Sequence, residues 1–236
     1  MEKQTTQEHS LTDAAVNGII RLIMTNDMQP GDKLPTEYQL AEQLGVGRST
    51  LREATRTLAM RNILEIRQGA GTFVSAKRGV PQDPLGLTFM ENDARLALEL
   101  FDIRLMLEPK AAEWAAAKAS QEQWRELEDC CDTLKARIDA GESYSEADEA
   151  FHSCIARCSG NRVLANLIPI VVSSIPMTTL SSEDRFRHST DAQHRRILGA
   201  LRRRDATGAA MAMSEHLNLN REFFAAKLEE AKKEKA

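Results

Sequence analysis

Several features that define other classes of protein are scarce or missing in this sequence. Aromatic residues make up only 5% of the chain and charged residues reach 28%, a balance that favours packed helices over a β-sandwich or barrel. The four cysteines, Cys130, Cys131, Cys154 and Cys158, include no C-x2-C pair, and the two adjacent ones would make a poor disulfide framework. The sequence has no run of about eighteen apolar residues, and its first residues lack the basic and apolar regions of a signal peptide. We therefore expect a cytoplasmic protein with reduced thiols and no membrane partner.

The length of the chain and its charge distribution indicate two regions. A chain of 236 residues is long enough for two domains of ~100 to 150 residues each. The net charge is -4, yet residues 1–78 hold 10 Lys and Arg against 9 Asp and Glu. Within residues 46–67, five arginines face only Glu53 and Glu65. A local basic surface on an acidic protein suggests that this region binds an anion.

Residues 1–78 show three helical segments followed by a short hairpin. The segments with helical periodicity are 11–26, 36–44 and 48–60. Thr36 and Gln39 form a capping-box pattern, and Gly45 is suited to the left-handed residue that ends the second helix. Ala41 is small enough for a close helix crossing, as a helix-turn-helix requires. Two β-like runs around a glycine-containing turn follow, 63–67 and 72–75, and predict a wing.

The composition changes again after residue 78. Residues 79–92 contain two prolines and two glycines and are typical of a linker. Residues 93–236 are helical almost throughout, with breaks expected near 119–121, 140–143, 159–161, 180–190 and 204–207. The predicted fold class is therefore mainly α, with an N-terminal winged helix-turn-helix domain and a C-terminal all-helical bundle of about six helices.

The third expected helix carries a row of cations. With its apolar residues turned inward, the opposite face holds Arg48, Ser49, Arg52 and Arg56. The N-terminal part of such a helix enters the DNA major groove in helix-turn-helix proteins. Arginine can pair with guanine or hold a phosphate, and Ser49 or Thr50 can bond to a base edge or the backbone. The alternative is a solvated amphipathic helix that binds nothing, and the adjacent turn and hairpin argue against it.

Three motifs follow one another in the first region: LP-x-E-x-x-L-A, V-x-R-S-T-L-R-E-A and Q-G-x-G-T-F-V. Through them, residues 11–75 resemble the GntR family of bacterial transcription regulators. The resemblance implies operator contacts by four residues, Arg48, Ser49, Thr50 and Arg52, with Gly69 in the wing tip. Tyr38, which we also expect at the DNA, stands where several members have arginine, and Gly47 where they have serine or threonine. We therefore expect a different operator preference.

Four side chains of metal-binding type point toward the core of the second region. Asp148 and His152 are four residues apart on one helix face, and His194 and His216 each lie on an apolar stripe. A single inward histidine is more often a hydrogen-bonded core residue, but four convergent groups left unpaired would cost ~1 to 3 kcal/mol each. Imidazoles with one carboxylate suit Zn, Ni, Fe or Mn. His188 lies in a polar segment and receives no ligand role.

The pattern R-x3-E-P (Arg104, Glu108 and Pro109), followed by D-x3-H and two isolated histidines, resembles the FCD ligand-binding domain of the FadR branch over residues 95–220. The resemblance implies that a divalent metal is held by Asp148, His152, His194 and His216, with an organic acid beside it. Zn is the favoured ion, with Ni, Mn and Fe as alternatives.

Two further features of the second region leave alternatives open. Arg104 interrupts an apolar row, so we expect its guanidinium to point inward and bind the carboxylate of an effector. The alternative is a simple i, i+4 pair with Glu108. Cys154 and Cys158 form C-x3-C near His152, which would suit zinc or redox chemistry, but core packing is favoured because Cys154 is turned away from His152.

Together these patterns predict a transcription regulator and not an enzyme. We expect a homodimeric repressor that binds a palindromic operator, is nucleoid-associated when bound, and is released by a small organic acid such as a sugar acid or hydroxy acid. A metal-dependent hydrolase of small carboxylates is the alternative from another class, because such a ligand set could activate water. A ligand-independent architectural DNA binder is a further alternative.

Overall fold

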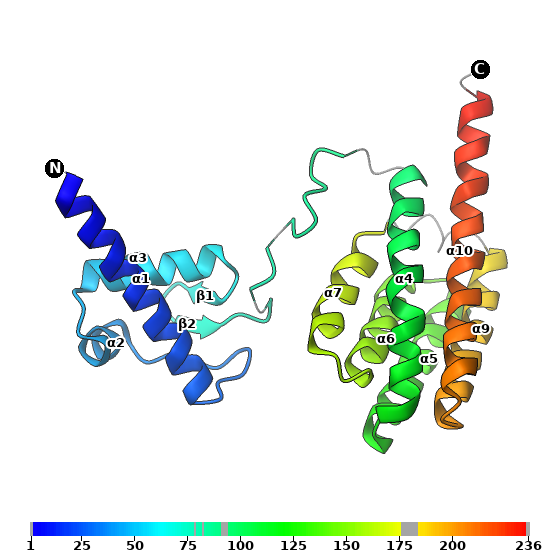
Figure 1. Ribbon diagram of the computed structural model, residues 1–236, viewed down its shortest axis with the longest axis horizontal. Helices are drawn as coiled ribbons and strands as arrows, with labels where there is room; N and C mark the ends of the chain where they lie inside the picture. Colours follow the sequence, from blue (N-terminus) through cyan, green and yellow to red (C-terminus); the bar gives the residue numbers. More distant parts are fainter. Residues whose placement is uncertain (1, 78, 82, 91–93, 176–183, 235–236) are drawn as a thin grey trace. The chain divides into compact units, whose positions relative to one another are not determined.

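The computed structural model describes residues 2–77, 79–81, 83–90, 94–175 and 184–234. Contacts within the chain divide it into two compact units, Met1–Pro84 and Leu85–Ala236. The division falls inside the segment 79–92 that we expect to be a linker. Each unit has a hydrophobic core of its own and is described by itself (Figure 1).

The first unit consists of three helices and a two-stranded antiparallel hairpin. Its elements are α1 (Glu2–Thr25), α2 (Glu37–Leu44), α3 (Arg48–Met60), β1 (Leu64–Arg67) and β2 (Gly71–Val74). The second and third helices and both strands lie where the sequence predicts them. The first helix was predicted too short, because it begins at Glu2 and not at Leu11.

Local sequence signals account for the turn between α2 and α3. The Thr36 side chain accepts a hydrogen bond from the backbone N–H of Gln39, and the Gln39 side chain in turn accepts from the backbone of Thr36. Gly45 ends α2 with φ 64, a left-handed conformation that glycine adopts without a steric penalty. The chain changes direction at this turn, and the first two residues of α3, Arg48 and Ser49, are exposed.

The core of the first unit lies under α3. Leu51, Ala54 and Leu58 are buried at helical spacing, together with Leu40 and Ala41 of α2. The opposite face of α3 is consequently left to solvent. In the hairpin, Leu64 pairs with Val74 and both are buried, which attaches the base of the wing to the same core.

The second unit is a helical bundle. The helices of its described part are α4 (Ala94–Lys118), α5 (Gln121–Asp139), α6 (Ser145–Cys158), α7 (Arg162–Ser173), α9 (Asp184–Arg202) and α10 (Ala206–Glu234). Their ends agree with the expected breaks except at the break predicted over 180–190. This break differs at both ends, because α7 already ends at Ser173 and α9 begins at Asp184; residues 176–183 lie outside the described part. Ser189 and Thr190 continue α9 despite their low helix propensity, and Thr190 is buried.

The long helices α4 and α10 run side by side and form one wall of the bundle (Figure 1). Helix α6 packs against α4, α5 and α7 and is buried on most of its surface. Cys154 and Cys158 are both buried in this core with their Sγ atoms 3.9 Å apart and no disulfide. None of the described helices has the length and apolar character needed to cross a membrane.

Candidate functional site

The exposed face of α3 presents the predicted DNA-contacting residues. Arg48, Ser49, Arg52 and Arg56 are exposed and Thr50 is half-buried. The Arg48 guanidinium lies over the Tyr38 ring, 5.6 Å from its centroid. Tyr38 is itself 61% exposed, so the two side chains join the first turn of α2 and the first turn of α3 into one exposed surface. Gly69 lies at the exposed tip of the hairpin with φ 72.

One acidic residue of this face was not assigned a role from the sequence. The Glu37 carboxylate accepts two hydrogen bonds from Arg52 Nε, at 2.9 and 3.0 Å. The contact joins the first residue of α2 to α3, and both side chains are largely exposed. Only one edge of the guanidinium is used, so the Nη atoms of Arg52 can still reach another acceptor. The position of Glu37 in the LP-x-E motif could have indicated a functional role for this residue. Nothing in the sequence spacing, however, identifies Arg52 as its partner.

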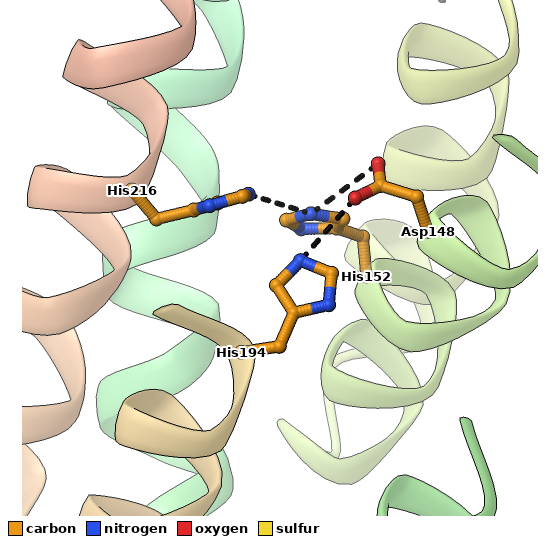
Figure 2. A group of neighbouring side chains, drawn as sticks. All are labelled: Asp148, His152, His194 and His216. Carbon is orange, nitrogen blue, oxygen red and sulfur yellow. Dashed lines mark hydrogen bonds and ion pairs between the residues drawn. The ribbon is translucent and has the colours of Figure 1, made fainter. Parts of the chain in front are cut away.

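The four predicted metal ligands converge in the bundle core (Figure 2). Helix α6 supplies Asp148 and His152, α9 supplies His194 and α10 supplies His216, and all four point toward one another. One candidate ligand atom from each residue lies within 4.8 Å of all the others. All four residues are at most 1% exposed. The sequence therefore placed these residues correctly on inward faces, and the tertiary structure brings them together.

Contacts inside the cluster leave several polar atoms unsatisfied. His194 Nε2 lies 3.2 Å from one Asp148 oxygen, and His152 Nε2 lies 3.7 Å from the other. His152 Nε2 and His216 Nε2 are 3.2 Å apart. Neither Asp148 oxygen and neither His194 nitrogen forms a hydrogen bond with good geometry among the described residues. Because unpaired buried polar atoms are costly, the cluster fits a divalent metal that these atoms would hold.

The electrostatics of the cluster favour the protonation states that metal binding requires. Burial opposes the charged form of Asp148, but the charges of His152 and His194 and a contact from His194 hold the pKa of this carboxyl well below its usual range. Burial lowers the pKa of His194, against the opposing effect of Asp148. Burial and the neighbouring imidazoles also lower the pKa of His216. The site thus combines an ionised carboxylate with at least two neutral imidazoles.

Two residues outside the cluster contact the Nδ1 atoms of two of its histidines. Glu108 Oε2 lies 2.5 Å from His152 Nδ1, and Gln193 Oε1 lies 2.7 Å from His216 Nδ1. Such partners orient an imidazole and decide which nitrogen is free to bind a metal. The Phe151 ring stacks on His194 at 4.1 Å between centroids. From the sequence, Glu108 was expected to contact only Arg104, and Gln193 was given no role. Gln193 is next to His194 in the sequence, but nothing there indicates that it contacts His216.

Arg104 is buried next to the cluster, as predicted, and is only 1% exposed. Its Nε donates to Glu108 at 2.5 Å, and its carbon Cζ lies 5.2 Å from the centre of the Phe101 ring. Both Nη atoms are buried and have no hydrogen-bond partner among the described residues. The inward orientation and the i, i+4 pair are therefore both present. Burial opposes ionisation of Glu108, but Arg104 and His152 lower its pKa to about 2.

Both predicted resemblances are matched by family models. Residues 11–74 match the model described as bacterial regulatory proteins, gntR family, and residues 99–219 match the FCD domain. The first match covers α2, α3 and the hairpin. The second covers all four residues of the buried His/Asp cluster, and metal binding is frequent in FCD domains.

Similar proteins span both units. A solved structure described as Streptococcus agalactiae GntR is 38% identical, covers 89% of this chain and 99% of its own, and superposes with a TM-score of 0.80. The Galactonate operon transcriptional repressor of Escherichia coli strain K12 is 27% identical over 85% of this chain and 91% of its own length. The Glc operon transcriptional activator of the same organism is 27% identical over 89% of this chain and 87% of its own length.

These relatives are regulators of transcription, and no comparison supports the hydrolase alternative. The matched domains account for the winged unit with its cationic helix and for the helical unit with its buried cluster. The chain belongs to the GntR family of bacterial regulatory proteins and is a transcription regulator with a C-terminal FCD domain.

Proposed function

We propose that the helical unit senses a small organic acid that binds beside a divalent metal. The observation that carries this proposal is the pair of Arg104 Nη atoms, which are buried without a partner next to a cluster of buried metal-binding side chains. A guanidinium buried in this way can bind a carboxylate through two parallel hydrogen bonds. Asp148, His152, His194 and His216 would hold the metal. When bound, the metal supplies positive charge that attracts an oxygen of the acid.

The chemistry of the donors supports Zn as the resident ion, with Ni, Mn and Fe as alternatives. Three imidazole nitrogens and one carboxylate oxygen suit all four ions, and Zn accepts such a set readily. A sugar acid or hydroxy acid is the proposed effector class, because its carboxylate would pair with Arg104 while a neighbouring hydroxyl could approach the metal. The relative named for galactonate supports a sugar acid.

The winged unit is proposed to bind a palindromic operator as part of a homodimer. Arg48, Ser49, Thr50, Arg52 and Arg56 would face the major groove with Tyr38 beside them, and Gly69 would bring the wing backbone close to the duplex. One such helix reads only a half-site, so a two-fold dimer would read both halves. We propose that the protein is a repressor released by its effector; the relatives include both a repressor and an activator.

The DNA proposal is tested by selecting duplexes from a random pool and measuring affinity by fluorescence anisotropy. We expect the selected sequence to be palindromic. Replacement of both Arg48 and Arg52 by alanine should reduce the preference for it by ~30 to 10⁴-fold, since each bidentate base contact contributes ~1 to 3 kcal/mol. Arg61→Ala, which removes an exposed arginine at the end of α3, serves as the control. Unchanged selectivity in the double variant would contradict the proposed role of α3.

The sensor proposal is tested on the purified full chain. Elemental analysis identifies the copurifying metal, and a thermal-shift panel of galactonate, lactate, glycolate and citrate identifies the acid. We expect a metal in near-stoichiometric amount and an acid whose stabilising effect is lost in Arg104→Met. If an acid binds but leaves operator affinity unchanged, that acid is not the effector. If the protein binds neither a metal nor any acid of the panel, it is not a sensor of this kind.

A further inference from the structure

Glu108 contacts both Arg104 and the metal-binding cluster. Its Oε1 accepts a hydrogen bond from Arg104 Nε, and its Oε2 lies at His152 Nδ1, both at 2.5 Å. The carboxylate is only 2% exposed, so water does not compete for either oxygen. Arg104 lies one turn earlier on α4, whereas His152 belongs to α6. A single carboxylate therefore joins the effector arginine to a metal ligand on another helix.

The contact with His152 determines which imidazole nitrogen can bind a metal. An ionised carboxylate can only accept hydrogen bonds, so the proton of neutral His152 must be on Nδ1. The lone pair is then on Nε2, the atom that faces Asp148 and His216. With the opposite tautomer, a hydrogen atom would point from Nε2 into the centre of the cluster. Glu108 thus prepares His152 for ligation before any metal arrives.

The contact with Arg104 determines which edge of the guanidinium can bind a ligand. Glu108 occupies Nε, while Nη1 and Nη2 stay buried and unpartnered. These two atoms form a fork that matches the two oxygens of a carboxylate. Stacking near Phe101 restricts the guanidinium further. The fork is therefore held in one orientation by the same carboxylate that orients His152.

We propose that Glu108 is a positioning residue that couples carboxylate capture by Arg104 to metal ligation by His152. The inference rests on the proposed sensor function and adds the residue through which the metal site and the acid site depend on each other. A metal held by His152 would fix the imidazole that Glu108 contacts, and through Glu108 it would also fix the arginine fork. By linkage, if the metal changes the affinity of the protein for the acid by some factor, the bound acid must change its affinity for the metal by that same factor.

Glutamine at position 108 separates this role from simple packing. It has nearly the shape of glutamate, but its amide offers one acceptor and one donor where Arg104 and His152 both present donors. If the amide NH2 faces His152, the imidazole must accept at Nδ1 and carry its proton on Nε2. If it faces Arg104, two donors oppose each other and the fork loses its anchor. Either arrangement damages one half of the coupled site.

The experiment measures metal affinity and the His152 tautomer in matched variants of the full chain. The metal-free protein is titrated with Zn²⁺ against a competing chelator, and ¹⁵N NMR of the histidine side chains reports the protonated nitrogen. Glu108→Gln leaves Arg104 buried without its anion and could fail to fold. Arg104→Met with Glu108→Met removes both charges and leaves His152 Nδ1 without an acceptor, and Arg104→Met alone retains the contact between Glu108 and His152. Glu113→Gln makes the same change on the exposed face of α4, where Glu113 pairs with Lys110.

We expect Glu108→Gln and the double variant to lose ~10 to 100-fold in Zn²⁺ affinity, as is typical when the partner of a metal-binding histidine is changed. In both, the proton of His152 should move wholly or partly from Nδ1 to Nε2. Glu113→Gln should keep the wild-type tautomer with a Zn²⁺ affinity within about threefold of that of the wild type, and Arg104→Met should keep the proton on Nδ1 because the contact between Glu108 and His152 remains. The NMR measurement is made without metal, so it does not depend on the proposed metal function.

Two results would overturn the inference: a wild-type His152 that carries its proton on Nε2, or a wild-type affinity for Zn²⁺ in the folded double variant. A wild type that binds no Zn²⁺ but shows the Nδ1 proton, lost in the Glu108 variants, would support the positioning of His152 and contradict the metal sensor. The two proposals therefore fail in different ways.

Discussion

The two units of this protein contain the same ion pair in opposite surroundings. Arg52 pairs with Glu37 on the surface of the winged unit, where the side chains are 64% and 41% exposed. Arg104 pairs with Glu108 inside the helical unit, where they are 1% and 2% exposed. In each pair the glutamate takes the Nε edge of the guanidinium and leaves the Nη atoms for another partner. The surroundings decide what that partner can be.

The surface pair suits a polyanion and the buried pair suits a small acid. Water screens the Arg52 pair, so it contributes at most ~1 kcal/mol to stability and can rearrange when DNA arrives. The buried pair is held in place by the surrounding helices, and removing one partner leaves an uncompensated charge. If the exposed cations bind DNA, their affinity for this long ligand should depend on salt. If the buried Arg104 binds the effector, it should select a ligand with two oxygens in one plane.

Breaking the buried pair should have the largest effect. Arg104→Ala leaves the Glu108 carboxylate buried with only His152 beside it, so the free energy of unfolding should fall by ~3 to 5 kcal/mol. Arg52→Ala is the matched substitution on the surface and should change it by less than ~1 kcal/mol. Urea denaturation of both metal-free proteins measures the difference. Equal losses would show that burial is not what distinguishes the two pairs.

Removing the metal should affect one unit and spare the other. A metal at 100 times its dissociation constant stabilises the folded state by ~2.7 kcal/mol, and a chelator should remove this contribution. Hydrogen exchange on the full chain should then rise in α6, α9 and α10, which carry the ligands, and stay constant in α2 and α3. His194→Ala is the control, because chelation should have little further effect on it. Equal changes in both units would contradict a metal site confined to the bundle.

The surface arginines should respond to salt in a way that the buried one cannot. If Arg56 contacts a phosphate, Arg56→Ala should reduce the slope of log affinity against log salt by ~1. Expressed per tenfold change in salt, that is about 1.4 kcal/mol. Anisotropy titrations with the selected operator at several salt concentrations measure the slope. Arg61→Ala should leave it unchanged, and an unchanged slope in Arg56→Ala would remove Arg56 from the interface.

Loosening the surface pair should have the smallest effect. Glu37→Gln removes a negative charge from the proposed DNA face and frees the Nε edge of Arg52, so affinity for random duplexes should rise by a few-fold. The preference for the operator should fall, because Arg52 loses the contact that orients it. Stability should change by less than ~0.5 kcal/mol, as is usual for exposed sites. Glu53→Gln, which removes an exposed carboxylate next to Arg52 on α3, is the control. An unaltered ratio of specific to random affinity in Glu37→Gln would argue against orientation by Glu37.

Local patterns made much of the fold predictable. The capping box at Thr36, the left-handed Gly45 and the glycine-containing hairpin turn depend on neighbouring residues only, and each is found where expected. The predicted starts of α1 and α9 and the predicted end of α7 were wrong, because helix ends have few sequence signals. The inward faces of the metal-binding residues followed from helical periodicity.

Contacts between distant residues could not be read in the same way. The spacing of Arg104 and Glu108 indicated an ion pair, but the approach of Glu108 to His152, 44 residues away, requires α4 to pack against α6. The contact of Gln193 with His216 and that of Glu37 with Arg52 likewise join separate helices. No sequence motif or spacing marks these polar residues as partners of one another.

The amino-acid sequence alone determined which helices form, which faces they bury and which cations lie on the exposed face of α3, because these properties follow from interactions along a few turns of chain. Tertiary packing alone decided that a carboxylate of α4 would stand between an arginine and an imidazole, and that the Nη atoms of this arginine would be buried without a partner. The physical reason is that burial and hydrogen bonding across helices depend on the positions of whole helices, which no local pattern records.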